Sequence, residues 1–122
     1  AIAAWLFLFA LAGSALVDAG QRAGLAVAEE AFVDRAYNRD GSLVPRHGDG
    51  AVISDDSAVI TRVRRMLEGG LVVSHDGSPI TLHADTICLH GDTPGSRRLA
   101  ELIRHELADM GVQVRAVSRA GT

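Results

Sequence analysis

Residues 86–94, with the sequence TICLHGDTP, decide how this chain is interpreted. The first four residues are apolar or β-favouring, which predicts a short buried strand from Thr86 to Leu89. The last two, Thr93 and Pro94, are typical of the N-cap and first turn of a helix. The three polar or flexible residues between them therefore stand at the carboxyl end of a strand. In α/β folds this edge collects ligands and catalytic groups, because its loops vary while strands and helices hold them in place.

His90, Gly91 and Asp92 place an imidazole, a flexible glycine and a carboxylate within three positions. Such a set can support acid/base chemistry or metal binding. A structural interpretation is equally open on the residues alone: Asp92 caps the helix and His90 fills a pocket, since such residues are common at helix starts.

The composition limits the classes of protein to consider. At 122 residues the chain is one domain or a piece of a larger one, and 48% hydrophobic with 22% charged residues is typical of a globular protein. The formal charge is −3, and all 12 basic residues are arginines spread along the chain. A spread of this kind does not favour nucleic acid as a partner.

Cys88 is the only cysteine, so an intramolecular disulfide and a cysteine-based metal site are both excluded. Lying in an apolar strand, it is expected to be a small core side chain more than a reactive thiol. A single buried cysteine fits a cytoplasmic protein best.

The uncharged run from Ala1 to Val17 resembles a signal peptide or a membrane span. It is short for a span, no basic segment precedes it, and Gly13-Ser14 interrupts it as a strand-to-helix turn would. We therefore expect a buried strand from Trp5 to Leu11 and no membrane association.

Further elements follow from apolar periodicity and from turn residues. Glu29 to Asp34 is expected to be the polar exit of a short strand, and the loop at 35–50 is long enough to suggest a function. The expected elements are a helix at 14–23, a strand at 25–27, a helix at 54–68, hairpin strands at 71–73 and 80–82, a helix after Pro94 that ends at Gly111, and a last strand at 112–117.

This alternation of strands and helices predicts a parallel α/β sheet. We find no internal linker, so residues 1–122 are expected to form a single domain. A complete β/α barrel needs about eight units over roughly 250 residues, so the chain would supply about half of one.

Four blocks then resemble one family. They are residues 11–14 (LAGS), residues 30–37 (EAFVDRAY), residues 43–46 with 50–53 (LVPR and GAVI), and residues 86–94. Their order and separation resemble the LamB/YcsF family from about Leu6 to Val114. Two N-terminal blocks of that family, Asp-x-Asn-x-Asp-x-Gly-Glu and Lys-Pro-His-Gly, have no counterpart here.

The resemblance implies the C-terminal half of a distorted seven-stranded β/α barrel of the glycoside hydrolase/deacetylase type. It also implies the role of the A subunit in ATP-dependent 5-oxoprolinase, a hydrolase that opens 5-oxo-L-proline to L-glutamate with partner subunits B and C. ATP would be a co-substrate, and the chain contains no Walker-type glycine loop to bind it. A divalent metal stays undecided.

The family blocks and the strand-end argument select the same candidate residues. The candidate catalytic residues are Glu30, Asp34, His90 and Asp92, and the candidate substrate- or phosphate-binding residues are Arg35, Arg46, Tyr37 and Gly91.

Opening a lactam with ATP needs an activated amide, a base for water and a cation for phosphate. We expect Asp92 or Asp34 as the base and His90 as an acid or a phosphate contact. Arg35 or Arg46 would bind phosphate, because guanidinium groups bind oxyanions through two donors.

Structural roles stay open for some of these candidates. Glu30 and Asp34 would form ion pairs with an arginine, and for Tyr37 packing is favoured because its ring is largely apolar.

Two other functions are compatible with the sequence. A metal-dependent amidase or deacetylase would use His90 and Asp92 as ligands, with more ligands from elsewhere. A non-catalytic remnant would serve as an interaction surface. In each case a half-barrel leaves apolar edges unpaired, so we expect the chain to form oligomers.

Overall fold

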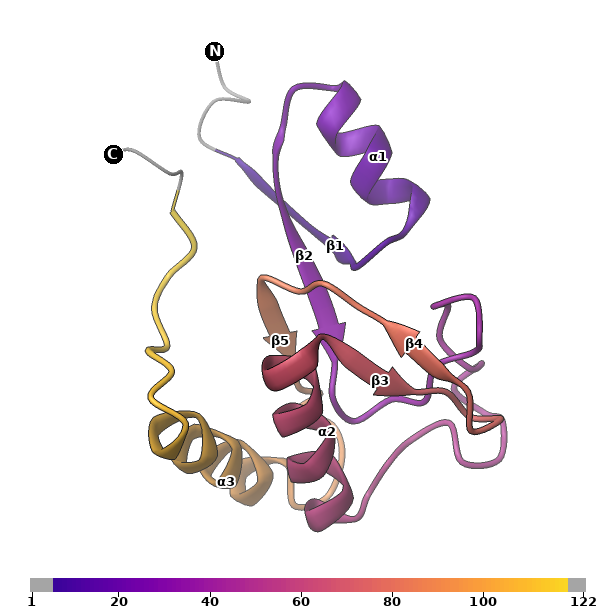
Figure 1. The fold of residues 1–122 in the computed structure, drawn as a ribbon, viewed down its shortest axis with the longest axis vertical. Helices are drawn as coiled ribbons and strands as arrows, with labels where there is room; N and C mark the ends of the chain where they lie inside the picture. Colours follow the sequence, from indigo (N-terminus) through magenta and orange to yellow (C-terminus); the bar gives the residue numbers. More distant parts are fainter. Residues whose placement is uncertain (1–5, 119–122) are drawn as a thin grey trace.

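The structure is a computed structural model that describes residues 6–118 (Figure 1). A parallel sheet has the strand order β1-β2-β5, and β3 and β4 form a separate antiparallel pair. The strands are β1 (Phe7–Leu11), β2 (Ala26–Phe32), β3 (Leu71–Val73), β4 (Pro79–Thr81) and β5 (Thr86–Cys88). The helices are α1 (Ala15–Arg22), α2 (Asp56–Gly69) and α3 (Ser96–Asp109). The predicted parallel α/β arrangement is confirmed, and Trp5 lies outside the described residues.

Strand β2 is longer than the sequence predicted. Its residues pair with β1 from Phe7↔Ala26 to Leu11↔Glu30, and its last three pair with β5 up to Phe32↔Cys88. The predicted polar exit beginning at Glu29 is therefore wrong, because the acidic residues continue the hydrogen-bonded ladder. One of their carboxylates is used locally, since Oε2 of Glu29 accepts the N–H of Gly13 at 2.9 Å.

Helix α2 lies within two residues of its predicted range. It begins after Asp55, whose carboxylate accepts the N–H of Ala58 at 2.9 Å. It ends at Gly70 with φ of 61°. This positive φ is a conformation that glycine adopts without the steric cost that Cβ imposes on other residues.

Helix α3 does not begin as predicted. Its N-cap is Gly95 with φ of 82°, and Thr93 belongs to the preceding turn, where its carbonyl accepts the N–H of Ser96. The predicted N-cap role of Thr93 is wrong, and so is the structural interpretation of Asp92 as the helix cap. Because the helix begins two residues later, the loop after β5 is longer than the sequence suggested.

A small apolar cluster of Ala36, Val44 and Ala51 lies after β2, and two larger apolar clusters form the rest of the core. One joins the end of β2 to α2 and α3, and the other joins the two sheets. The first contains Val33, Val59, Val63, Leu99, Ile103 and Leu107. The second contains Ala12, Ala31, Tyr37, Val72 and Leu82. Both clusters meet at β2, which fixes the position of the residues that follow this strand.

The predicted last strand at 112–117 is wrong. This segment leaves α3 as an extended chain without strand pairing, drawn in yellow in Figure 1. A strand needs a neighbour for its backbone N–H and C=O groups, and alternation of apolar residues does not supply one. Val114 is accordingly 54% exposed.

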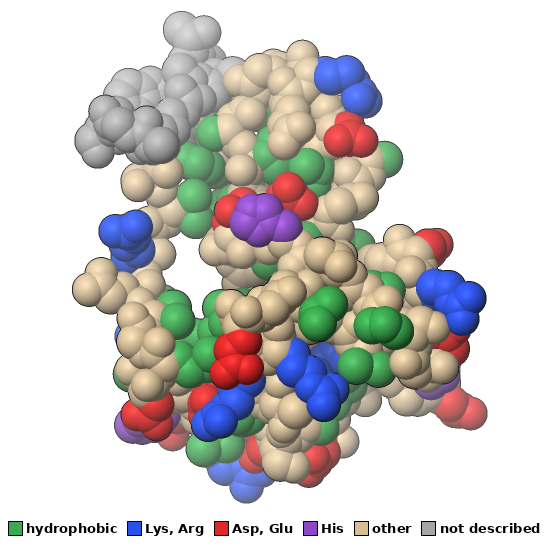
Figure 2. All heavy atoms as spheres, viewed as in Figure 1, with side chains coloured by type: hydrophobic (Ala, Val, Ile, Leu, Met, Phe, Trp, Pro, Cys, Tyr) green, Lys and Arg blue, Asp and Glu red, His purple; other side chains and the backbone are tan. Residues whose placement is uncertain are grey.

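The surface mixes charges of both signs. Figure 2 shows basic and acidic side chains interspersed over the face in view, with apolar side chains around the opening beside the C-terminal segment. Among the described residues, no helix is long and apolar enough to cross a membrane.

Candidate functional site

Asp34 and His90 meet because β2 and β5 are parallel neighbours. Each residue stands two positions past its strand, and the strands end in register at Phe32 and Cys88. Nδ1 of His90 lies 3.0 Å and 3.1 Å from the two carboxylate oxygens of Asp34. The main-chain N–H of His90 also donates to Oδ2 of Asp34 at 3.1 Å. The structure thus brings Asp34 and His90, both selected from the sequence as candidate residues, into direct contact.

This contact gives the two groups different roles. Asp34 is buried, with only 2% of the residue exposed. Because its carboxylate accepts the hydrogen on Nδ1 of His90, a neutral His90 ring has its free lone pair on Nε2. The imidazole is also stacked on Phe32, with ring centroids 5.3 Å apart and planes 18° apart. With the ring fixed in orientation and its side chain 24% exposed, His90 is the group that a substrate can reach.

The space beside His90 is narrow. A cleft of about 10 Å³ lies between the loop after β5 and the start of α2. It is lined by Asp34, Ile53, Ser54, Asp56, Leu89, His90, Thr93, Pro94, Gly95, Ser96 and Leu99. This volume is about what one water molecule needs. A substrate would therefore have to reach His90 through its exposed part and not through this cleft.

Arg46 and Asp92 form an exposed ion pair next to this loop. Nη2 of Arg46 lies 2.5 Å from Oδ2 of Asp92, and the side chains are 44% and 62% exposed. Exposed ion pairs contribute little to stability, so an incoming anion can replace Asp92 as the partner of Arg46 at small cost. Gly91 lies between His90 and Asp92. Apart from its two chain neighbours, no atom of the described residues lies within 4 Å of the position that a Cβ would take there, so packing does not require a glycine at this position.

Two other candidates have structural contacts. The guanidinium of Arg35 donates to the carbonyls of Val44 at 2.9 Å and Ala51 at 3.3 Å, both within its own loop region. Tyr37 is fully buried, and its hydroxyl accepts the N–H of Phe32 at 2.8 Å. Burial raises the pKa of Tyr37. Of the two arginines, Arg46 is the one left accessible to an anion.

Glu30 does not leave the strand together with Asp34, as the sequence suggested. It is a paired residue of β2, opposite Leu11 on one side and Thr86 on the other. The negative charge of Glu30 still affects a residue at this edge of the sheet. The pKa of the Cys88 thiol is raised mainly by burial, and further by the negative charges of Glu30 and Asp34. A raised pKa leaves less thiolate, which supports the expectation that Cys88 is not reactive, although its side chain is only partly buried and belongs to none of the core clusters that the described residues form.

Sequence reasoning missed Phe32 and Arg62. The position of Phe32, two residues before Asp34, would have indicated its contact with the imidazole if the true end of β2 had been known. Arg62 contacts the main chain around Asp34 from helix α2, and no local motif marks it.

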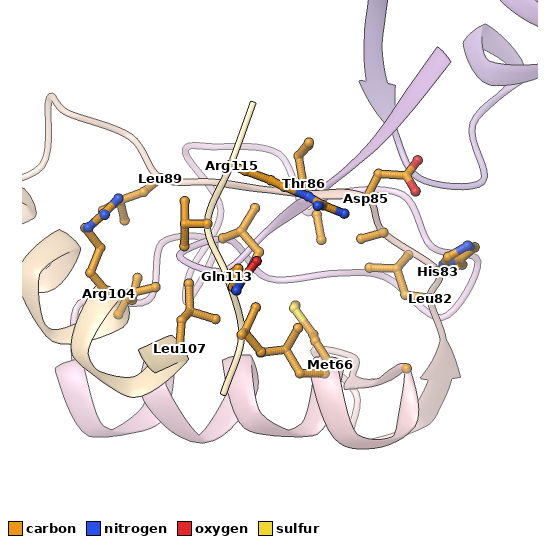
Figure 3. Close-up of a pocket in the computed structure, with 18 of the residues that line it drawn as sticks. Met66, Leu82, His83, Asp85, Thr86, Leu89, Arg104, Leu107, Gln113 and Arg115 are labelled. Carbon is orange, nitrogen blue, oxygen red and sulfur yellow. The ribbon is translucent and has the colours of Figure 1, made fainter. Parts of the chain in front are cut away.

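A much larger hollow lies elsewhere. It has a volume of about 670 Å³ and is bounded by β5, α2, α3 and the segment at 112–115 (Figure 3). Met66, Leu82, Leu89 and Leu107 give it a mostly apolar wall. It contains none of the candidate catalytic residues, so we assign the site from the chemistry at His90 and not from the size of the cavity. Within residues 6–118, no group of three or more His, Cys, Asp or Glu side chains is placed to hold a metal ion.

Comparison with known proteins agrees with the motif-based resemblance. The model of the LamB/YcsF family matches residues 1–122. The A subunit of 5-oxoprolinase from Heliobacterium modesticaldum is 50% identical over 111 residues, which are 91% of this chain and 44% of the relative. The corresponding 5-oxoprolinase subunit from Bacillus subtilis is 45% identical over 113 residues, or 93% of this chain and 44% of the relative.

A solved structure has the same fold. The crystal structure of a lactam utilization protein from Thermus thermophilus superposes with a TM-score of 0.83 at 38% identity. The match covers 92% of this chain and 44% of that protein. The chain thus spans a little under half the length of these relatives.

Proposed function

Because the chain belongs to the LamB/YcsF family, we propose that it supplies the acid/base part of a lactam-opening site in an enzyme of the 5-oxoprolinase type. The observation that carries this proposal is the contact between the buried carboxylate of Asp34 and Nδ1 of His90. A carboxylate in this position orients an imidazole and stabilises its protonated form, as general acid/base catalysis requires.

The proposed reaction is the opening of 5-oxo-L-proline to L-glutamate. ATP, as co-substrate, would supply the phosphoryl group that activates the amide oxygen. Nε2 of His90 takes a proton from the attacking water, and Asp34 stabilises the imidazolium that forms. The same nitrogen then returns the proton to the lactam nitrogen as the C–N bond breaks, which leaves an amine and an acyl phosphate. A second water then displaces inorganic phosphate from the acyl phosphate, so that the carboxylate of L-glutamate results.

Arg46 is the proposed contact for a phosphate group. It is accessible, and its present partner is the exposed Asp92, two residues after His90. One guanidinium suits one phosphate group and not a whole triphosphate. We therefore propose that most of the nucleotide contacts come from parts of the enzyme outside these 122 residues.

The rest of the assembly is also a proposal. The relatives carry the name of one subunit of a larger enzyme, and we propose that this chain works with partner subunits B and C. We further propose that the sheet β1-β2-β5 continues into the distorted seven-stranded barrel, with the remaining strands contributed by the half of the relatives' length that this chain does not cover.

A metal-dependent amidase or deacetylase is a second candidate. It is favoured by one observation: metal-binding histidines commonly donate the hydrogen on their other ring nitrogen to a carboxylate, as His90 does to Asp34. Elemental analysis of the purified enzyme distinguishes the two proposals. One zinc per site, lost together with activity on chelation, would favour the metal-dependent reaction.

The test of the proposed function is His90→Ala in the assembled enzyme that contains this chain, with His105→Ala as the control. His105 lies on an exposed face of α3. Glutamate release from 5-oxo-L-proline with ATP should fall about 10²–10⁴-fold for His90→Ala and little for His105→Ala. Near wild-type turnover of His90→Ala, with an unchanged thermal melt, would overturn the proposal.

A further inference from the structure

Arg62 of α2 makes an unusual set of contacts. Its guanidinium donates to the main-chain carbonyls of Arg35 at 2.9 Å, Val33 at 3.2 Å and Val73 at 3.4 Å. Two of these carbonyls belong to the residues immediately before and after Asp34. A single side chain therefore holds the peptide unit that precedes Asp34 and the peptide unit that follows Arg35.

The environment of Arg62 makes this arrangement specific. The side chain is partly buried, burial lowers its pKa, and the guanidinium lies 5.8 Å from the centroid of the Tyr37 ring. Arginine remains charged in such a site, and its donors form a planar fork that suits several acceptors at once. The carbonyl of Asp34 itself accepts the N–H of Ile53 at 2.8 Å. The carbonyls of three consecutive residues, Val33, Asp34 and Arg35, thus accept hydrogen bonds that fix the backbone around Asp34.

We propose that Arg62 is a positioning residue for the Asp34–His90 pair. By holding the carbonyls of Val33 and Arg35, Arg62 fixes the backbone before and after Asp34 and so orients the carboxylate, which keeps the hydrogen of the neutral His90 imidazole on Nδ1. The lone pair of Nε2 then remains free to accept a proton. The catalytic meaning of this arrangement rests on the proposed function, but the position of the hydrogen can be measured without any turnover.

The experiment is ¹⁵N NMR of the His90 ring in the labelled 122-residue chain, at a pH where the imidazole is neutral. In the wild type we expect the shift pattern of a ring protonated on Nδ1. Arg62→Met should change this to a mixture in which the hydrogen also occupies Nε2. Arg65→Met is the matched control, because it removes the same charge from an exposed position of the same helix and should leave the wild-type pattern.

Two further variants separate geometry from charge and from folding. Arg62→Lys keeps the charge but replaces the fork with one ammonium group, so we expect the mixture to persist in part. Complete rescue by lysine would assign the effect to charge and overturn positioning by the fork. If Arg62→Met does not fold, Arg62→Gln replaces it, because an amide still donates to one of the carbonyls. A wild-type ring pattern in a folded Arg62→Met or Arg62→Gln variant would overturn the proposal.

The two proposals fail separately. If Arg62→Met shifts the ring hydrogen while His90→Ala leaves glutamate release unchanged, Arg62 positions a pair that is not catalytic. If His90→Ala abolishes turnover while Arg62→Met leaves the ring pattern intact, the proposed function stands and the role of Arg62 is wrong. In the assembled enzyme, a true positioning role predicts that Arg62→Met lowers kcat with little change in KM.

Discussion

In the part of the chain that the structure describes, the two sides of β5 differ in whether a neighbouring strand pairs with them. On one side β5 pairs with β2, and the residues after both strands form the Asp34–His90 contact. On the other side it borders an apolar hollow of about 670 Å³, and the segment at 112–115 crosses that hollow without pairing (Figure 3). A polar contact at the end of two neighbouring strands needs only those strands, whereas a further strand needs a partner along its whole edge.

The largest stability difference should separate the core beside β2 from the unpaired segment. Val63 of α2 is fully buried in the cluster that joins this helix to α3 and to the end of β2. Val63→Ala should therefore lower the free energy of unfolding by about 2 kcal/mol. Ending the chain at Gly111 should cost only about 0.5 kcal/mol, as changes at exposed positions usually do. Urea unfolding of both variants measures this. An equal loss in the two would mean that the segment at 112–118 is part of the cooperative core.

Self-association should depend on the open side of β5. Because the hollow and the unpaired edge expose apolar surface, we expect the sedimentation coefficient of the chain to rise with concentration. Val114→Lys should reduce this rise, while Leu16→Lys on α1 should not, although the two side chains are 54% and 52% exposed. A monomer at every concentration would contradict the expectation of oligomers.

The smallest expected effect concerns the turn between β3 and β4, which contains Asp76. Hydrogen bonds from the Ser74 hydroxyl and the Ser78 N–H lower the pKa of Asp76 to about 2. The pKa of Asp76 is lower in the folded chain than its ordinary value near 3.9 in an unfolded chain. The ionised carboxylate therefore stabilises the fold fully above about pH 4, and this stabilisation is lost as the pH falls towards 2. Carbon NMR of the carboxyl should give a midpoint near 2. Ser74→Ala should raise that midpoint, and an unchanged midpoint would exclude the hydroxyl as the cause.

Local signals predicted much of the fold. The Asp76-Gly77 turn predicted the β3–β4 hairpin, and the apolar spacing around Val59 and Val63 predicted α2. These features depend on residues close in the sequence. Asp34 and His90 were also among the candidate residues selected at strand ends, and parallel strands bring such carboxyl ends together.

The errors have a common physical cause. Glu29 looked like the end of a strand, and residues 112–117 looked like a strand, because pairing with a distant neighbour decides both cases and the sequence does not display it. Thr93 lost the N-cap position to Gly95 because an additional turn, closed by the hydrogen bond from the Ser96 N–H to the Thr93 carbonyl, precedes α3. The roles of the two carboxylates likewise depended on contacts: Asp34 is buried against His90, and Asp92 is exposed on Arg46.

The central claim is that Asp34 with His90, and not Asp92, forms the acid/base unit. It is tested most directly by comparing Asp34→Asn with Asp92→Asn for glutamate release from 5-oxo-L-proline in the assembled enzyme. An asparagine at position 34 keeps the size of the side chain but not the charge that stabilises an imidazolium, so turnover should fall about 10²–10⁴-fold. Asp92→Asn should change it by less than about tenfold, because an exposed ion pair contributes little. Near wild-type turnover for Asp34→Asn, or an equal loss for Asp92→Asn, would contradict the account.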